Sequence, residues 1–476
     1  MDHRPRPSFA TLLFTPLSTL LSTLLALAAL VVPASALGCP PGRGHHRGHE
    51  GDCQGNRVGD VRWEIRSSHP LMDWRGPGRV LVEVQVRADR LAAAKRRPIA
   101  TAIVLDRSGS MRGSKWSDAA EAARAAIRRL EPGDIVSVVS YASDVRVDWP
   151  ARRFERRDRD DLMRVIDRMQ PTGSTYLEGG LRRAAEQLRD IKRGDRPTRI
   201  LLVSDGNANV GVQSGDGLSR IARGYAADGI VTTTIGLGTD YNEDTMTAVA
   251  DGGNGSYYYV RESERLAETF STEIERMMAT AARRVSVRVR PGAGVRVRRV
   301  LGYVTEPFGD GGVEIPLGDL ASGAERSVLL ELELRCDRRG RQRLAGIELG
   351  FEDRDGEPRH DHADVDVDVV EDHRRVERER DQRVLGRYEE HKLAEEMKES
   401  AELVQRGKGE EARLRLQAAS QRAREMAKRS GNKSLEQAAD EAEERADAAP
   451  AASQQAAPAR EHYKKSMKAR AYHMAK

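Results

Sequence analysis

An acidic residue and two serines directly follow an apolar, β-branched run from Thr101 to Leu105. Such a run predicts a buried strand, and Asp106, Ser108 and Ser110 lie on the loop at its carboxyl end. Open α/β sheets bind ligands at that edge. One carboxylate and two hydroxyls at alternate positions can converge on one point, and these hard oxygen ligands suit Mg²⁺. The alternative is that Asp106 caps the helix expected from Ser117 and that the serines only form a turn.

Two later segments also place oxygen-bearing side chains beside expected strands and helices. Thr175 lies in the segment from Pro171 to Leu177, which opens a helix. Asp205 ends a second apolar strand, from Arg199 to Ser204. These two segments favour the metal site over the turn interpretation through the set of motifs that they complete with the first one.

The three motifs are, in order, Asp-x-Ser-x-Ser, Gly-x-Thr and a strand-ending Asp-Gly. This set resembles the metal-ion-dependent adhesion site of von Willebrand factor type A (VWA) domains. The resemblance implies that a divalent cation, Mg²⁺ with Mn²⁺ or Ca²⁺ as alternatives, is held by Asp106, Ser108, Ser110, Thr175 and Asp205. It also implies that a protein partner donates a carboxylate to the open position of the metal, which water fills otherwise. In that family one acid and the threonine can act through water, so the direct ligands stay open here.

A bound metal could instead activate water for hydrolysis, which requires a general base and a substrate cleft. The acids in and around the loop after the strand from Ile230 to Leu237 are Asp240, Glu243, Asp244 and Asp251. Helix capping and turn formation account for them. The sequence holds no His-Glu-x-x-His, Gly-x-Ser-x-Gly or Walker motif, so we expect no enzymatic activity.

Residues that flank the motifs have two interpretations each. Gly206 to Gly211 is either a ligand-facing loop with available backbone amides or an ordinary turn into the next helix. Arg107 and Arg112 either steer an acidic ligand toward the metal or belong to a surface that is rich in arginine.

Residues 98–283 alternate strands and helices, which predicts a doubly wound, mainly parallel sheet covered on both faces. Val145 to Trp149 follows its preceding strand after only three residues, too few for a crossover, so it should be an antiparallel edge strand. A helix from Ser263 to Ala282 is expected to close this domain. The resemblance implies the same fold, that of a VWA domain.

Short alternating runs with Gly, Asp and Pro turns fill residues 284–371, the pattern of an antiparallel β-sandwich. Two alternating runs within residues 58–97 are expected to complete it. The VWA domain would then be inserted in, or followed by, the sandwich. Bacterial secreted proteins and inter-alpha-trypsin-inhibitor heavy chains carry a similar β region beside their VWA domain, although the resemblance is specific for residues 98–283 and looser outside them.

Residues 372–448 are rich in Glu, Arg, Ala and Lys, which predicts two or three helices in a hairpin or small bundle. Residues 449–476 are expected to be a linker rich in Ala, Pro and Gln followed by a basic tail. From Arg460 onward this tail carries six basic residues against Glu461. It could touch an anionic lipid surface or form a solvated helix.

Residues 1–36 predict a signal peptide, because Arg4 and Arg6 precede an uncharged run that ends in a small-residue cleavage pattern, Ala34-Ser35-Ala36. The run is also long enough to span a bilayer as an uncleaved anchor. Either interpretation places the protein outside the cytoplasm, in the periplasm, at the cell surface or secreted.

Residues 37–57 predict a flexible linker that is rich in Gly, Pro and His. Its histidines could bind a transition metal, but a solvated linker is the favoured interpretation. Cys39 and Cys53 could close a small loop in an oxidising compartment. Cys336, at the end of an apolar strand, is expected to be a buried thiol.

The formal net charge of +5 is spread over surfaces that mix Arg with Asp and Glu. The sequence shows no helix with a basic face for reading bases and no aromatic residues among the basic ones, so nucleic acid is not an expected partner. We expect divalent-metal-dependent protein binding, in adhesion or complex assembly outside the cytoplasm. The alternatives are a scaffold subunit of an envelope complex that uses the helical region and, least favoured, a metal-dependent hydrolase.

Overall fold

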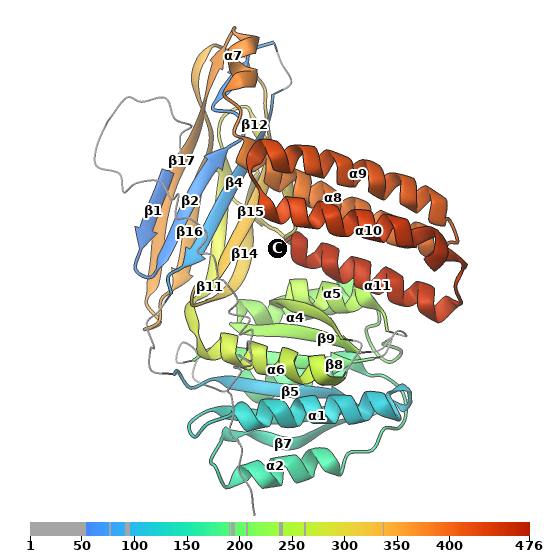
Figure 1. Ribbon diagram of the computed structural model, residues 1–476. Helices are drawn as coiled ribbons and strands as arrows, with labels where there is room; N and C mark the ends of the chain where they lie inside the picture. The colour runs from blue at the N-terminus through green and yellow to red at the C-terminus, as the bar shows by residue number, and fades with distance from the viewer. Residues whose placement is uncertain are drawn as a thin grey trace, which may run out of the picture. The chain divides into compact units, whose positions relative to one another are not determined.

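The computed structural model describes residues 54–75, 78–90, 96–189, 191, 196–205, 208–237, 241–260, 263–336 and 338–476. The predicted signal peptide, Cys39 and Cys53 lie outside these residues, as does most of the predicted linker. The described residues form an α/β domain, a β-sandwich and a helical region (Figure 1). The predicted fold class is confirmed.

The sheet of the α/β domain has the strand order β10-β9-β8-β5-β6-β7. In chain order its strands are β5 (Ala100–Asp106), β6 (Ile135–Tyr141), β7 (Val145–Arg153), β8 (Thr198–Ser204), β9 (Ile230–Leu237) and β10 (Asn254–Val260). Neighbouring strands pair in parallel except β6 and β7, which are antiparallel. The predicted antiparallel edge strand is therefore confirmed, because a three-residue connection allows only a hairpin.

Helices cover both faces of this sheet. One face packs against α1 (Ser114–Arg129), α2 (Asp158–Asp167) and α6 (Ser263–Met278), and the other against α3 (Leu177–Arg189), α4 (Gly215–Ala227) and α5 (Glu243–Gly252). Along β5 the side chains alternate between the two cores: Ile103 and Leu105 join the first, Ala102 and Val104 the second. All seven residues of β5 are buried, as expected of a central parallel strand.

The sandwich consists of one sheet with the order β1-β2-β4-β15-β12 and a second with the order β13-β14-β11-β16-β17-β3. Its strands are β1 (Gln54–Val58), β2 (Val61–Ser67), β3 (Leu71–Asp73), β4 (Arg79–Ala88), β11 (Thr280–Pro291), β12 (Val295–Leu301), β13 (Glu306–Phe308), β14 (Gly312–Ala321), β15 (Glu325–Leu334), β16 (Gly340–Glu352) and β17 (Pro358–Val370). Because β4 pairs with β15, the α/β domain between them is an insertion into the sandwich.

Three local expectations for the sandwich need correction. Residues 54–57 belong to β1, not to a flexible linker, because their backbone pairs antiparallel with β2 although the sequence lacks apolar alternation. The helix expected to reach Ala282 ends at Met278, since Ala281 and Ala282 already lie on β11 and pack in the sandwich core. Cys336 is half-buried rather than buried and packs against the same core.

The helical region contains α7 (His373–Arg378), α8 (Gln382–Gln405), α9 (Gly409–Ser430), α10 (Lys433–Gln454) and α11 (Ala457–Met474). The linker expected from residue 449 is therefore wrong, whereas the tail forms a helix, one of its two expected alternatives, but packs against other helices instead of being solvated. Helix α10 continues through Pro450, and Pro458 lies in the first turn of α11, where its missing N–H removes no helical hydrogen bond. Tyr463, Met467 and Ala471 of α11 are buried in one core with α8, α9 and α10.

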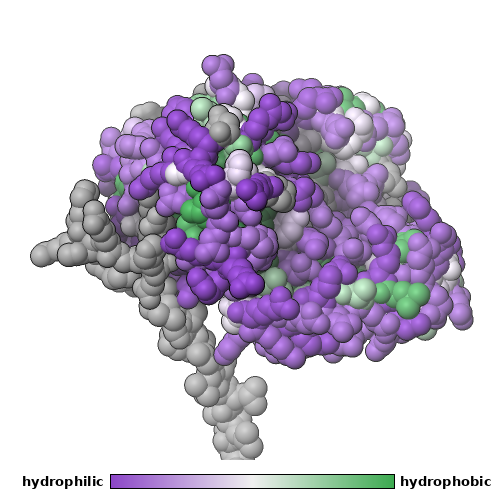
Figure 2. All heavy atoms as spheres, turned by 90° about the horizontal axis from the view of Figure 1, so that it is seen from above, coloured by the Kyte–Doolittle hydropathy of each residue, from purple (hydrophilic) through white to green (hydrophobic). Residues whose placement is uncertain are grey.

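The surface seen in Figure 2 is mainly hydrophilic, with small and separate hydrophobic patches. Within the described parts of the chain, no helix is long and apolar enough to cross a membrane.

Candidate metal centre

The first motif begins at the end of β5, and the side chain of its acid, Asp106, points into the protein. Asp106 is fully buried, and its Oδ1 accepts a hydrogen bond from the backbone N–H of Ser108 at 2.8 Å. Its Oδ2 accepts one from the Ser204 hydroxyl at 2.7 Å. The acid does not cap α1, whose N-cap residue is Gly113. The capping alternative is wrong, although the bond to Ser108 does make a local turn.

The two serines connect this acid to the end of β8. The Oγ atoms of Ser108 and Ser110 lie 3.0 Å apart, and the Ser110 hydroxyl donates to Asp205 Oδ1 at 2.8 Å. Because Ser110 uses its one proton on Asp205, Ser108 donates to Ser110. The structure thus brings Asp106, Ser108, Ser110 and Asp205 together at the carboxyl edge of the sheet.

The loop that carries Thr175 lies against the first motif through its backbone. The Gly109 N–H donates to the Gly173 carbonyl at 3.0 Å, and the Thr172 N–H donates to the Arg107 carbonyl at 2.6 Å. Gly173 has a φ of +76°, and a Cβ there would come within 2.6 Å of Ser143 Oγ, so this position of the Gly-x-Thr motif requires glycine. Thr175 itself is buried.

Three residues that sequence reasoning missed support the candidate ligands. Lys115 Nζ donates to Asp205 Oδ2 at 2.6 Å, and Ser204 holds Asp106 as described. The Asn209 side chain accepts from the Thr175 N–H at 2.8 Å. Only Ser204 carried a sequence signal, as the neighbour of a predicted ligand. Asn209 shows that the described part of the loop from Gly206 to Gly211 has an internal role, while residues 206–207 lie outside the described chain.

Burial dominates the electrostatics of the site. It raises the pKa of Asp106 to about 6, with a further increase from the nearby Asp205 charge, while hydrogen bonds from Ser204 and Ser108 oppose the shift. A carboxylate that is this poorly solvated gains from a nearby cation. Across the described residues, no three His, Cys, Asp or Glu side chains are grouped to hold a metal, so a cation here would depend on two carboxylates and the hydroxyls. That donor set fits Mg²⁺.

The two arginines beside the first motif differ in exposure. Arg107 is buried, donates from Nε to Ser140 Oγ at 3.2 Å and forms an ion pair with Asp144. The Asp144 carboxylate, which is 52% exposed, balances the charge of the buried Arg107, and this pairing does not favour the steering role for Arg107. Arg112 is exposed, and its Nε lies 3.4 Å from the Pro171 carbonyl oxygen.

The acids considered as a hydrolytic base contact α11 instead. Glu243 lies 2.9 Å from Lys464 Nζ, Asp244 accepts from Lys468 at 3.0 Å, and Tyr472 donates to Asp251 at 3.0 Å. Burial opposes ionisation of Glu243, but the neighbouring lysines prevail and lower its pKa. A lowered pKa makes a carboxylate a weaker base. Asp240 lies outside the described residues.

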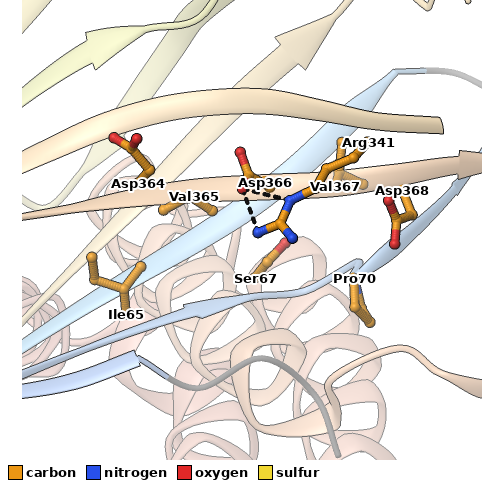
Figure 3. Close-up of a pocket in the computed structure, with 9 residues that line it drawn as sticks. All are labelled: Ile65, Ser67, Pro70, Arg341, Asp364, Val365, Asp366, Val367 and Asp368. Carbon is orange, nitrogen blue, oxygen red and sulfur yellow. Dashed lines mark hydrogen bonds and ion pairs between the residues drawn. The ribbon is translucent and has the colours of Figure 1, made fainter. Parts of the chain in front are cut away.

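A separate cavity in the sandwich, of about 60 Å³, lies between β2 and β17 (Figure 3). Asp366 points toward Arg341 and accepts its Nε–H at 2.8 Å, while Ile65, Ser67 and Pro70 line the opposite side. Ligand pockets typically measure about 300–1,000 Å³, so this cavity is too small for a ligand of ordinary size.

Comparison with known proteins agrees with this fold. Residues 102–272 match the model of the von Willebrand factor type A domain. The inserted α/β domain is therefore a VWA domain, a class that generally mediates protein–protein interaction and often binds a divalent metal.

Relatives of known sequence cover this domain and part of its surroundings. The chain is 29% identical over 241 residues to the uncharacterized protein YfbK of Escherichia coli (strain K12), covering 48% of this chain and 41% of that protein. It is 27% identical over 270 residues to the uncharacterized protein sll0103 of Synechocystis, covering 54% and 63%. Inter-alpha-trypsin inhibitor heavy chain H2 of Mus musculus is 28% identical over 159 residues, covering 32% and 17%. In each case the chain spans less than two thirds of the relative.

Two solved structures share more of the fold. A von Willebrand factor type A protein from Catenulispora acidiphila superimposes with a TM-score of 0.67 at 21% identity, covering 79% of this chain and 88% of that chain. The ArnB paralog VWA2 from Sulfolobus acidocaldarius gives a TM-score of 0.58 at 18% identity, covering 86% and 98%. At these identities the likeness shows the fold alone, and it extends beyond the VWA domain.

Proposed function

We propose that the VWA domain binds a divalent cation and, through it, a carboxylate of a protein partner. Mg²⁺ is the first choice, with Mn²⁺ and Ca²⁺ as alternatives. The cation would be held by Asp106, Ser108, Ser110, Thr175 and Asp205. The observation that carries the proposal is the hydrogen-bonded chain from Ser108 through Ser110 to Asp205, beside the buried Asp106.

The charges at this edge explain why a partner would supply an acid. Ser108, Ser110 and Thr175 are neutral ligands, so they leave a bound cation electrophilic. Mg²⁺ prefers an octahedral shell of oxygen ligands and keeps water where the protein offers none. An anionic oxygen from outside the chain can replace such a water, which makes binding of the partner dependent on the metal.

Binding accounts for the arrangement better than hydrolysis does. Hydrolysis would need a base next to the metal, whereas the described acids of α5 pair with lysines of α11. The same pairs use the basic charge that would have favoured contact between α11 and a lipid surface. We therefore propose neither hydrolysis nor lipid contact.

For the cellular setting we propose export, guided by residues 1–36 as a signal peptide or an uncleaved anchor. The partner would then be met in the periplasm, at the cell surface or outside the cell. The VWA domain of this proposal starts at residue 98 and ends with α6 at Met278, because β11 belongs to the sandwich, and the sandwich and the helical region support it.

Capture of a partner from envelope extract tests the proposal. Immobilised wild-type protein is compared with Asp106→Asn, with Mg²⁺ and with EDTA. Asp160→Asn, an exposed acid on α2, is the matched control. The proposal expects one partner that the wild type and the control retain only with Mg²⁺. A partner retained equally by all proteins in EDTA would contradict it.

A further inference from the structure

Lys115 places a second positive charge beside the proposed metal ligands. It is the second residue of α1, and its Nζ lies 2.6 Å from Asp205 Oδ2. The Asp205 side chain is fully buried, whereas the Lys115 side chain keeps 23% of its surface exposed. The pair therefore joins a fixed, desolvated carboxylate to an ammonium group on a flexible stem that reaches solvent.

Each of the two carboxylate oxygens of Asp205 thus accepts a hydrogen bond. Oδ1 accepts from Ser110, a proposed ligand, while Oδ2 accepts from Lys115. A divalent cation on Asp205 would lie close to the ammonium if Lys115 stays, and like charges at this range repel strongly in a poorly solvated site. If Lys115 swings away, the ion pair with a buried carboxylate is broken. Both routes weaken the binding of the metal.

We propose that Lys115 is a built-in competitor that sets the affinity of this site for divalent cations. This inference rests on the proposed function, because it requires that Asp205 binds the metal. Lys115 keeps a positive charge on the buried Asp205 carboxylate, and a divalent cation replaces that contact only at sufficient concentration.

Isothermal titration with Mg²⁺ and with Mn²⁺ tests the inference on the full chain. Lys115→Met removes the charge and keeps an unbranched stem, Lys115→Gln keeps a hydrogen-bond donor, and Lys115→Arg keeps the charge. Arg112→Met is the matched control, because it removes an exposed charge near the same loop that has no ion pair with Asp205. Circular dichroism establishes that each variant is folded.

The inference expects Lys115→Met and Lys115→Gln to bind both cations about tenfold more tightly than the wild type. Lys115→Arg should stay within about twofold of the wild type, because it keeps a positive charge beside Asp205. Arg112→Met should also stay within about twofold, because the charge that it removes does not contact Asp205. Equal or weaker binding by the uncharged variants would overturn the inference while leaving the proposed function intact. Absence of binding by every protein, wild type included, would overturn both.

Discussion

The edge of the sheet at Asp106 and the contact of α11 with the VWA domain are built by different means. At the sheet edge, Ser110 and Asp205 are 95 residues apart and meet because both follow parallel strands of one sheet. At the second contact, Lys465 of α11 donates to the Tyr241 carbonyl across 224 residues. Strand ends converge by topology, whereas a docked helix depends on side chains that match only in three dimensions.

The α11 contact is also far more aromatic. Lys465 is fully buried with its ammonium 3.9 Å from the centre of the Tyr241 ring. Tyr472 packs edge-on against Tyr257, and Tyr259 is hydrogen-bonded to His462 at 2.9 Å. Figure 1 shows α11 between α5 and the other long helices. We infer that this contact contributes mainly to stability and the sheet edge mainly to binding.

The largest expected effect is at the α11 contact. Lys465→Glu would place a buried carboxylate near Glu243 and lose the bond to Tyr241, so we expect it to lower the free energy of unfolding by about 3–5 kcal/mol. Lys398→Glu, at an exposed position of α8, should change it by less than about 0.5 kcal/mol. Urea unfolding followed by circular dichroism measures both. Equal effects would contradict the structural role of α11.

Asp106 should make stability depend on pH. Its folded pKa, about 6, lies above the ordinary value of 3.8, so the protonated acid favours the folded state. This stability is fully present below pH 4 and is lost as the pH rises through 6, at a cost of about 3 kcal/mol. In EDTA, the stability of the wild type should therefore fall relative to Asp106→Asn between pH 4 and pH 7. Parallel pH profiles for the two proteins would refute the shift.

The sheet edge could be predicted from the sequence to a greater extent than the α11 contact. Asp106 and Asp205 were predictable, because apolar runs reveal strands and strand ends reveal the edge where ligands gather. Lys115 was not, since its rotamer on α1 decides whether it meets Asp205. The docking of α11 was missed for a related reason: its lysines resembled a solvated tail, and their partners Glu243 and Asp244 resembled helix caps.

A bound metal should stabilise the folded protein through the sheet edge at Asp106, and a substitution far from that edge should not change this effect. A ligand that binds only the folded state at about 100 times its Kd adds about 2.7 kcal/mol. Saturating Mg²⁺ should raise the thermal midpoint of the wild type, and EDTA should reverse the change. Asp106→Asn should not respond, while Lys398→Glu should respond like the wild type. A response by Asp106→Asn equal to that of the wild type would place the cation elsewhere.

The smallest expected effect concerns the rim of the α11 contact. Asp244 is largely exposed, although it pairs with Lys468 at 3.0 Å. Exposed ion pairs contribute about 0–1 kcal/mol, so Asp244→Asn should lower the free energy of unfolding by less than about 1 kcal/mol. This loss should be smaller still in high salt, because salt screens the ion pair of the wild type. Urea unfolding at low and high salt measures the change. A decrease in the free energy of unfolding as large as that of Lys465→Glu would show that the exposed pair at Asp244, and not the buried Lys465, holds α11 in place.

A crystal of the protein grown with Mn²⁺ and measured for anomalous scattering would locate the proposed cation directly. We expect one strong peak at the carboxyl edge of the sheet, within bonding distance of oxygens from Asp106, Ser108, Ser110, Thr175 or Asp205, directly or through water. Displacement of Lys115 from Asp205 would accompany it if the ammonium yields to the metal. A crystal with saturating Mn²⁺ and no peak at this edge would contradict metal binding by these residues.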